Sequence, residues 1–415
     1  MAGVFLALLQ AQDHPTIEVG EDRLLSDSGP ALPLAESQLS TNPNDAKQLL
    51  VGVIQFGAPD AHNRSFCVAW TSFDGGQHWI RSSPPVEGCA DPWGVILADG
   101  SAIMVMLGQV KGQKDSAFLV RSPDGGRTWP DTPLGLGFYR DHPMVIAQGN
   151  QVYVVSDQKV RNSANQVRST VSVAHSQDGG KTFGPSTRVI ASNVGYQATG
   201  LALLSDGAFV VGFHDYQQKG RDKRLVSPRS WMLRSADQGR TFSEPLLISE
   251  SCESRGGWPS MAVDGKDHLF WLCIADKFNG VLVHRSDDRG ESWSEPLRLN
   301  HSETARSFTP SIAVNKDDVI GVSWYEIHPK NCFDVYFTAS LDGGKTFLPE
   351  VRVSSATSCP DTPQNRGVFD PGMTFGAGGD YSGLATTSDR LFHVVWSDAR
   401  TGLYQLRTAS VRVKR

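Results

Sequence analysis

The 415-residue sequence lacks several features that mark whole classes of protein. Past its first residues it has no run of about 18 apolar residues, so we expect no membrane-spanning helix. It has no Cys-x-x-Cys pair and no cluster of histidines, so we expect no metal site and no cofactor. The net charge is only −5, which gives no reason to expect nucleic acid or a membrane surface as a partner.

Cysteine is scarce, and the six cysteines fall into three close pairs. The pairs are Cys67 with Cys89, Cys252 with Cys273, and Cys332 with Cys359. The first and third pairs bracket a copy of the repeat described below in the same way, as disulfides between neighbouring strands would. Six buried free thiols are the alternative. We favour disulfides, and with them a secreted or periplasmic protein.

The first twelve residues, MAGVFLALLQAQ, contain a short apolar run, and no basic residue precedes Arg23. An apolar run followed by small residues is typical of a secretory signal. We interpret residues 1–12 as the remnant of a signal peptide and residues 13–415 as a single domain.

A nine-residue pattern recurs along the chain. RSPDGGRTW, at residues 121–129, is one of six near-copies of Ser-x-Asp-x-Gly-x-x-Trp/Phe. Their aspartates are Asp74, Asp124, Asp178, Asp237, Asp288 and Asp342, at intervals of 50, 54, 59, 51 and 54 residues. A near-constant period of this length indicates a repeat architecture. The short polar side chains and the glycines are those of a tight turn between strands, so we assign the pattern no catalytic role.

Three strand-like runs precede each copy of the pattern. In the second repeat these runs begin at Trp93, Ala102 and Ala117. The sequence contains seven such first strands, and the last repeat, from Tyr381, lacks both the pattern and its outer strand, which Pro15–Val19 would supply. We therefore predict an all-β fold, a seven-bladed propeller of four-stranded antiparallel blades closed by its terminal strands. A six-bladed propeller with an N-terminal extension is the alternative.

The repeated pattern resembles the Asp box, or BNR repeat, of the sialidase-like β-propellers, and the resemblance covers about Glu36 to Val413. It implies that the pattern joins the third and fourth strands of each blade, on the face away from the active site. It also implies a sialidase-like glycoside hydrolase with a carbohydrate substrate.

The same resemblance implies three catalytic residues. The segment DYSGLA places Tyr381 in the Tyr-Ser-x-Leu context of the family's nucleophile. Glu253 stands before a first strand two blades earlier, where the base that takes the phenol proton is expected. Asp115 lies nine residues before Asp124, at the spacing of the acid/base Asp. A phenol with a pKa of about 10 needs such a base, and a Tyr nucleophile is a known variant among glycosidases.

The family's three substrate-binding arginines are not matched in this sequence. Their positions read Ala90–Asp91, Ala275–Asp276 and HPKNC around Lys330. The carboxylates at the first two positions would repel a sugar carboxylate. Replacements from neighbouring loops would be Arg140, Arg255 and Arg306.

The loops that begin first strands and those that follow second strands meet at one mouth of a propeller's channel. The binding residues that we expect there are Asp91, Arg140, His142, Asp276, Arg255, Arg306, His214 and Tyr325. Basic loops in the second to fourth blades favour an acidic glycan, and solvated loop tips are the alternative reading.

The sequence thus predicts a secreted, monomeric glycoside hydrolase that acts on an oligo- or polysaccharide, neutral or anionic. Two alternatives stay open. One is a non-catalytic propeller that binds a glycan or a protein. The other is a polysaccharide lyase whose base is Tyr216, His214 or His142.

Overall fold

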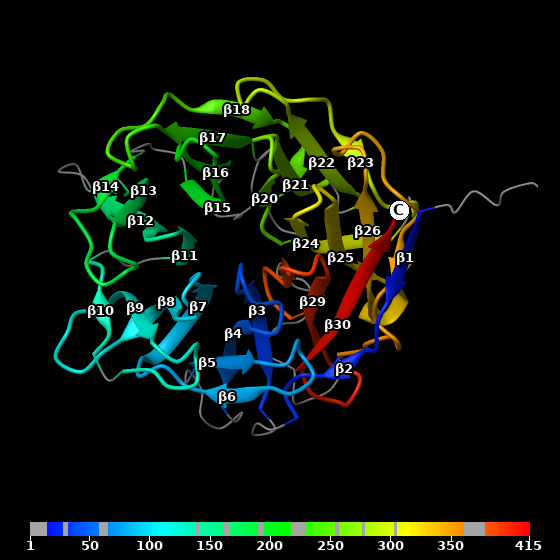
Figure 1. Cartoon of the computed structure of the whole chain (residues 1–415), viewed down its shortest axis with the longest axis horizontal. Coiled ribbons are helices and arrows are strands. Elements are labelled where there is room, and N and C mark those ends of the chain that lie inside the picture. Colours follow the sequence, from blue (N-terminus) through cyan, green and yellow to red (C-terminus); the bar gives the residue numbers. More distant parts are fainter. Residues whose placement is uncertain are drawn as a thin grey trace, which may run out of the picture.

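A computed structural model shows the chain as a ring of β-sheets around a central axis (Figure 1). It describes residues 15–27, 32–57, 65–130, 132–137, 141–161, 167–189, 195–216, 229–253, 257–275, 279–302, 305–360 and 378–415. In these ranges the chain forms strands and one 3₁₀ turn, Pro329–Asn331, and no α-helix. A helix that could cross a membrane is likewise absent from them. The predicted all-β fold is confirmed.

The strands follow one another as four-stranded antiparallel units. The first two units contain β3 (Leu34–Thr41), β4 (Leu49–Phe56), β5 (Ser65–Ser72) and β6 (Ile80–Ser82), then β7 (Glu87–Ile96), β8 (Ala102–Gln109), β9 (Ser116–Ser122) and β10 (Leu134–Gly135). The third and fourth contain β11 (Asp141–Gln148), β12 (Gln151–Arg161), β13 (Val167–Ser176) and β14 (Thr187–Arg188), then β15 (Gly195–Leu203), β16 (Phe209–Tyr216), β17 (Ser230–Ser235) and β18 (Leu246–Ser249).

The remaining units complete the ring. The fifth and sixth contain β19 (Cys252–Glu253), β20 (Ser260–Val263), β21 (Leu269–Ala275), β22 (Val281–Ser286) and β23 (Leu297–Arg298), then β24 (Arg306–Val314), β25 (Ile320–Ile327), β26 (Phe333–Ser340) and β27 (Val351–Arg352). The last contains β28 (Gly383–Thr386), β29 (Phe392–Asp398) and β30 (Gln405–Lys414), together with β1 (Thr16–Val19) and β2 (Arg23–Leu24) from the other end of the chain.

Hydrogen bonding groups these strands into six sheets, because the first two units join through a single pair, Phe66 with Glu87. The innermost strands of all the units surround one central cavity of about 540 Å³. The strands that line it are β3, β7, β11, β15, β20, β24 and β28. These seven inner strands favour the predicted count of seven blades. In this count the eight-stranded sheet of β3 to β10 is two blades.

The two ends of the chain share a sheet. β1 pairs antiparallel with β30, with Thr16 opposite Lys414 and Val19 opposite Val411. The side chain of Asp22, which follows β1, is almost fully buried and forms ion pairs with Arg407 and with Arg400. The raw edge of the last sheet is therefore covered by the N-terminal strand, as ring closure requires.

Buried apolar clusters lie between neighbouring units around the ring. Trp396 of β29 and Phe337 of β26 share one cluster, and Trp70 of β5 and Val395 of β29 share another. The strands are rich in β-branched and apolar residues on both faces because each unit is covered on two sides. The second of these clusters joins the first unit to the last.

The six repeated patterns form turns with the same hydrogen bonds. In the second, the Ser122 hydroxyl donates to Asp124 (2.6 Å) and accepts from the Gly126 N–H (2.7 Å). The N–H of Thr128 also donates to Asp124 (2.9 Å). The other five copies repeat these contacts. We call these segments the repeat turns, and each follows the third strand of its unit.

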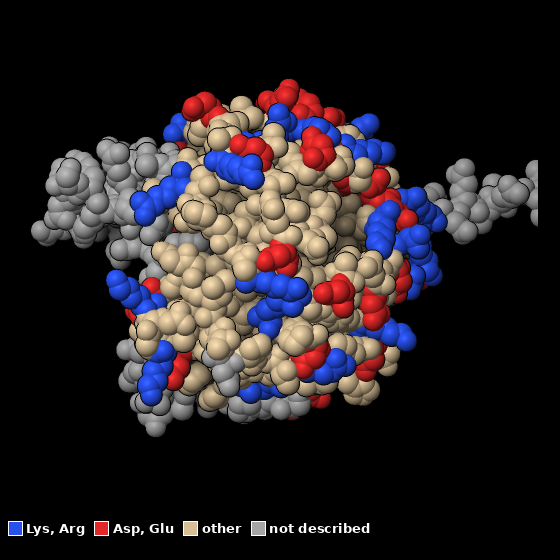
Figure 2. Space-filling view, turned by 60° about the vertical axis from the view of Figure 1, so that its left-hand side comes forward, with Lys and Arg blue, Asp and Glu red and all other residues tan. Residues whose placement is uncertain are grey.

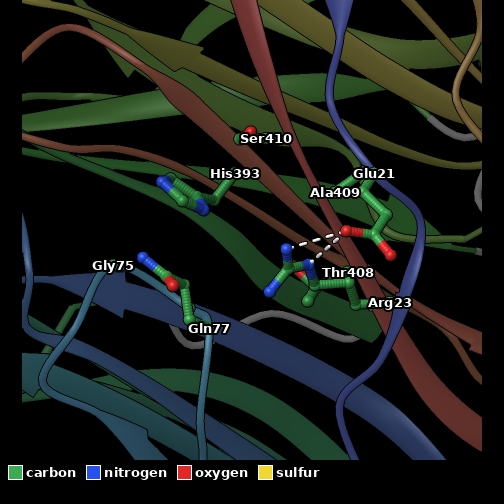
Figure 3. Close-up of a pocket in the computed structure, with 9 residues that line it drawn as sticks. Glu21, Arg23, Gly75, Gln77, His393, Thr408, Ala409 and Ser410 are labelled. Atoms are coloured by element: carbon green, nitrogen blue, oxygen red, sulfur yellow. Dashed lines mark hydrogen bonds and ion pairs between the residues drawn. The ribbon is translucent and has the colours of Figure 1, made fainter.

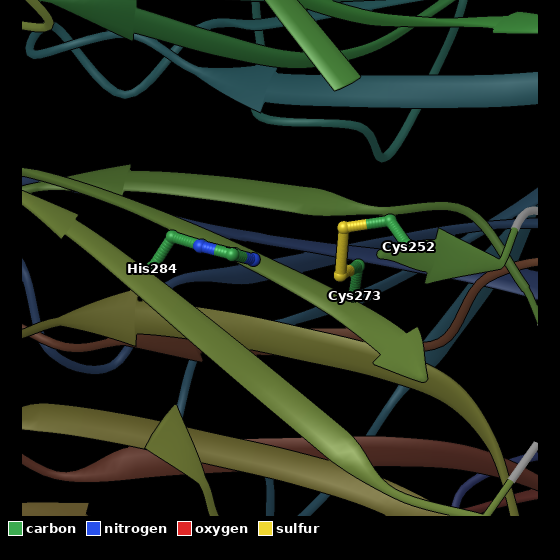
Figure 4. Close-up of side chains that lie close together, drawn as sticks. All are labelled: Cys252, Cys273 and His284. Carbon is green, nitrogen blue, oxygen red and sulfur yellow. A yellow bond between two sulfur atoms is a disulfide. The ribbon is translucent and has the colours of Figure 1, made fainter. Parts of the chain in front are cut away.

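The three predicted disulfides are confirmed. Cys67 is bonded to Cys89, Cys252 to Cys273 and Cys332 to Cys359. His284 points toward the second of these bonds (Figure 4), and its ring lies within 4.8 Å of both sulfurs. Because both sulfurs are bonded to each other, neither offers the thiolate that a metal would need. The expected signal segment lies outside the described residues.

Candidate functional site

Four of the innermost strands carry the same kind of bulge near their beginnings. In β7, Ala90 pairs with Leu107 and Trp93 with Val105, so two residues of β7 face one of β8. β3, β11 and β24 show the same offset. The first bulged residue has a positive φ in all four strands: Glu36 (60°), Asp91 (52°), His142 (44°) and Thr309 (41°). A positive φ is costly for such residues, and strain of this kind is concentrated at functional sites.

The bulges lie at the end of the ring opposite the repeat turns. The first and third strands of an antiparallel unit run in the same direction, the bulge is near the start of the first, and the turn follows the end of the third. Bulged residues from several units therefore meet at one mouth of the central cavity. Trp93 and Thr199, at or beside the bulges of β7 and β15, line that cavity.

Four carboxyl groups from different units lie together at this mouth. They are Glu36, Asp91, Asp141 and Asp380, and we call them the acidic cluster. Glu36 is only 6% exposed, and its side chain is hydrogen-bonded to that of Asp91. The main-chain N–H of His142 also donates to Asp91, at 3.1 Å.

The pKa values of three cluster members are raised. Burial, followed by the charges of Asp91 and Asp380, raises the pKa of Glu36 well above its usual range. Burial and the charge of Asp141 raise the pKa of Asp91 to about 6. Burial also raises the pKa of Asp380 to about 7, against the opposing effect of a hydrogen bond from the Trp258 side chain. At neutral pH Glu36 is therefore protonated and donates to an ionised Asp91.

Aromatic rings form the other part of the mouth. The Tyr381 ring lies 5.5 Å from that of Trp93 and 5.2 Å from that of His142, measured between centroids. The His142 ring stacks on Trp258 at 4.5 Å. Burial lowers the pKa of His142 to about 4, so the imidazole is neutral and its Nδ1–H donates to the Ala198 carbonyl.

Several buried polar atoms near the mouth have no hydrogen-bond partner in the described part of the chain. Among them are the Tyr381 hydroxyl and Nε2 of His142. Burial and the four nearby carboxyl groups raise the pKa of Tyr381 well above 10, so the phenol keeps its proton. Buried polar atoms are nearly always paired, so an unpaired donor and an unpaired acceptor side by side point to a ligand.

The structure brings some of the sequence-predicted residues together. Tyr381, Asp91 and His142 belong to the mouth, and the buried His214 lies 5.8 Å from the Trp258 ring. Asp115 is exposed in the loop before β9, where it accepts a hydrogen bond from Gln109.

Two of the other predicted residues, Arg306 and Tyr325, are described with their side chains. Arg306 is exposed, with its guanidinium over the Phe308 ring. Tyr325 is buried between the sixth and last units, where its hydroxyl accepts from the Ser397 N–H, and this burial removes it from the mouth. The main chain of Glu253 pairs with Ile274. Outside the described residues lie the side chain of Glu253 and all of Arg140, Arg255 and Asp276.

Glu36 is a site residue that the sequence did not predict. Glu36 precedes the channel-lining part of β3 in the same way as Asp91 precedes that of β7. This equivalent position in the repeat could have predicted Glu36 as a site residue. Asp141 and Asp380 are the chain neighbours of His142 and Tyr381, which were predicted to belong to the site. The sequence did not show that the side chains of these two aspartates also face the mouth.

Comparison with known proteins identifies the fold. No model of a known protein family matches the sequence, and no curated protein matches it. Among solved structures, a protein of unknown function from Dyadobacter fermentans is similar, with a TM-score of 0.55, 13% identity, and coverage of 96% of this chain and 99% of that chain. A mutant of the NanB sialidase from Streptococcus pneumoniae has a TM-score of 0.50 and 11% identity, over 95% of this chain and 70% of that chain. The fold is that of the sialidase-type β-propellers. At these identities the likeness shows the fold alone.

Proposed function

We propose that this chain is a glycoside hydrolase that acts at the mouth of the central channel. The observation that carries the proposal is the acidic cluster, where a protonated carboxylic acid and an ionised carboxylate lie together at neutral pH. Most glycosidases need one carboxyl group in each state, and neighbouring carboxyl groups with separated pKa values are how proteins provide them. Because one fold hosts many activities, the propeller itself carries less weight.

Within this proposal the cluster supplies the acid and the base. Asp380, with a pKa of about 7, donates a proton to the leaving oxygen, since a general acid is most effective with a pKa near the working pH. Asp91 stays ionised and stabilises positive charge at the anomeric carbon or activates water. Glu36 and the His142 N–H hold Asp91 in place through hydrogen bonds.

The family resemblance supports a second assignment for the same activity. In that assignment Tyr381 is the nucleophile, Glu253 takes its proton and Asp115 is the acid/base. The place of Tyr381 in the mouth supports this role. The exposed position of Asp115 favours the cluster as the source of the acid.

The mouth suits a neutral sugar. Trp93, Trp258 and Tyr381 offer apolar ring faces to a pyranose or furanose, and the carboxylates accept hydrogen bonds from its hydroxyl groups. The described cluster is acidic, so it disfavours a sugar that carries its own carboxylate. We therefore propose a neutral oligosaccharide in place of the anionic one. The three disulfides support an oxidising, extracytoplasmic location.

The test is hydrolysis of a panel of neutral and acidic aryl glycosides by the purified chain. We expect turnover of a neutral substrate and a loss of about 100-fold or more in Asp380→Asn, since general acid catalysis contributes 10²–10⁴-fold. The exposed Asp27→Asn is the matched control and should keep full activity. Sugar binding without any product would leave a non-catalytic binding propeller, and an unsaturated product absorbing in the near ultraviolet would identify a lyase.

Further variants separate the two assignments. If the cluster is the acid and base, Asp115→Asn and Glu253→Gln keep most of the activity, and Tyr381→Phe mainly raises KM. If Tyr381 is instead the nucleophile, as the family resemblance implies, Tyr381→Phe abolishes turnover. In that case Asp380→Asn raises KM and leaves kcat nearly unchanged.

A further inference from the structure

A second cavity, of about 350 Å³, opens between the last unit and the first (Figure 3). Its walls are the segment between β1 and β2, the first repeat turn, and strands β29 and β30. The lining side chains include Glu21, Arg23, Gln77, His393, Thr408 and Ser410. Because it touches a repeat turn, this cavity lies at the end of the ring opposite the acidic cluster.

The last unit, which forms one wall of this cavity, differs from the other units because it has no repeat turn. In the other units the third strand leads into a Ser-x-Asp turn, whose backbone folds over the end of the strand. In the last unit the third strand, β30, runs to Lys414, and its fourth strand comes from the other end of the chain. Thr408 and Ser410 of β30 are therefore not covered by a turn of their own unit.

His393 occupies a position that is apolar elsewhere in the ring. The second glycine of a repeat turn packs against a second-strand side chain of the preceding unit. A Cβ built on that glycine would lie 3.2 Å from Leu50, 2.6 Å from Ile103, 3.7 Å from Tyr153 and 2.9 Å from Phe270 in four such contacts. At the first repeat turn, the corresponding neighbour of Gly76 is His393, at 3.8 Å. The last unit has thus exchanged an apolar contact for an imidazole.

Three polar side chains face this cavity without a hydrogen-bond partner among the described residues. They are His393 and Thr408, each 4% exposed, and the partly buried Ser410. His393 and Ser410 are cross-strand partners, so both side chains project from the same face of the sheet. Burial lowers the pKa of His393 to about 4, so the neutral ring offers one donor and one acceptor. Their polar atoms remain accessible from the cavity, where a bound ligand could pair them.

The charges that line the cavity cancel. Arg23 is ion-paired with Glu21 at 2.7 Å, and both side chains border the opening (Figure 3). An anionic ligand would meet the Glu21 carboxylate, and a cationic one would meet the Arg23 guanidinium. A neutral ligand rich in hydroxyl groups matches hydroxyls, an imidazole and an amide, which both donate and accept.

We propose that this cavity is a second carbohydrate-binding site, which holds one or two residues of a neutral glycan on the face opposite the channel mouth. The hydroxyl groups of the sugar pair with His393, Thr408 and Ser410. This inference does not depend on the proposed hydrolase activity, because it uses a different cavity and different residues.

The experiment is an NMR titration that follows the imidazole signal of His393, with neutral disaccharides such as lactose, cellobiose and arabinobiose as probes. We expect one of them to shift this signal in a saturable way in the wild-type chain and equally in Asp380→Asn. His393→Leu installs the residue type found at the equivalent position of the first unit, so it should fold and should weaken binding at this cavity at least about tenfold. Because this variant lacks the reporter imidazole, its binding is followed through the main-chain amide signals of Thr408 and Ser410, which are also recorded in the wild type. Ser410→Ala is a milder second variant, and the exposed His301→Leu is the matched control.

The outcomes separate this proposal from the proposed function. A saturable His393 shift without any hydrolysis supports the second site and removes the hydrolase. Hydrolysis without a His393 shift by any neutral sugar overturns the second site. A shift produced by inorganic sulfate but by no sugar overturns the ligand class, and unchanged binding in His393→Leu overturns the location.

Discussion

Replacement of Asp380 by Asn is expected to stabilise the protein, with a gain that depends on pH. Burial raises the pKa of Asp380 from 3.8 to about 7, so the folded chain holds a proton that the unfolded chain releases at lower pH. The native state therefore loses stability as the pH rises from about 4 through 7, by about 1.4 kcal/mol per pH unit. Asn carries no charge and keeps an oxygen that accepts from the Trp258 side chain.

The size of the effect follows from the shift. A difference of about 3 pKa units corresponds to about 4 kcal/mol of destabilisation once Asp380 is fully ionised in the native state, above about pH 8. The weaker hydrogen bond that an amide accepts reduces the gain by about 1 kcal/mol. We therefore expect Asp380→Asn to raise the free energy of unfolding by about 3 kcal/mol at pH 8.5 and to lower it by about 1 kcal/mol at pH 4, where only the weaker hydrogen bond is felt.

Urea unfolding of the wild type and the variant at several pH values between 4 and 8.5, followed by tryptophan fluorescence, measures this difference. The exposed Asp27→Asn serves as the control and should be neutral throughout. A gain that is the same at both ends of the pH range would show that Asp380 is not held protonated by burial. A variant that is less stable than the wild type at pH 8.5 would refute the reasoning altogether.

Three further predictions concern the scaffold and are measured as changes in urea midpoint. Ser122→Ala leaves a buried main-chain N–H unpaired in the second repeat turn and should cost about 1–3 kcal/mol; no change would show that the hydroxyl is dispensable. Gly126→Ala should be clearly destabilising because φ is 96° and the new Cβ would lie 2.5 Å from a threonine hydroxyl, whereas Gly184→Ala, with open space around it, should be tolerated. Replacing Cys67 and Cys89 together by Ala should cost about 3 kcal/mol, and an unchanged midpoint would contradict a structural role for that disulfide.

The residues that meet at the mouth and at the second cavity could not be predicted from the sequence. Glu36 and Asp380 are 344 residues apart, and they meet only because ring closure places the first unit beside the last. The bulges then turn these side chains toward the channel, and their offsets depend on pairing with the second strand. The raised pKa values follow from burial in the assembled ring, so no local segment predicts them.

The repeat turns and the disulfides, in contrast, could be predicted from the sequence alone. Each repeat turn satisfies its hydrogen bonds within nine residues, so Ser, Asp and Gly at fixed offsets were enough to predict the all-β repeat architecture. The cysteine pairs could be predicted because the two members of each pair are only 22, 21 and 27 residues apart along the chain. The surroundings of His393 could not be predicted, because its neighbours in the cavity come from the first repeat turn and from the segment between β1 and β2. Contacts within one repeat are fixed by spacing along the chain, whereas contacts between repeats exist only once the ring has closed.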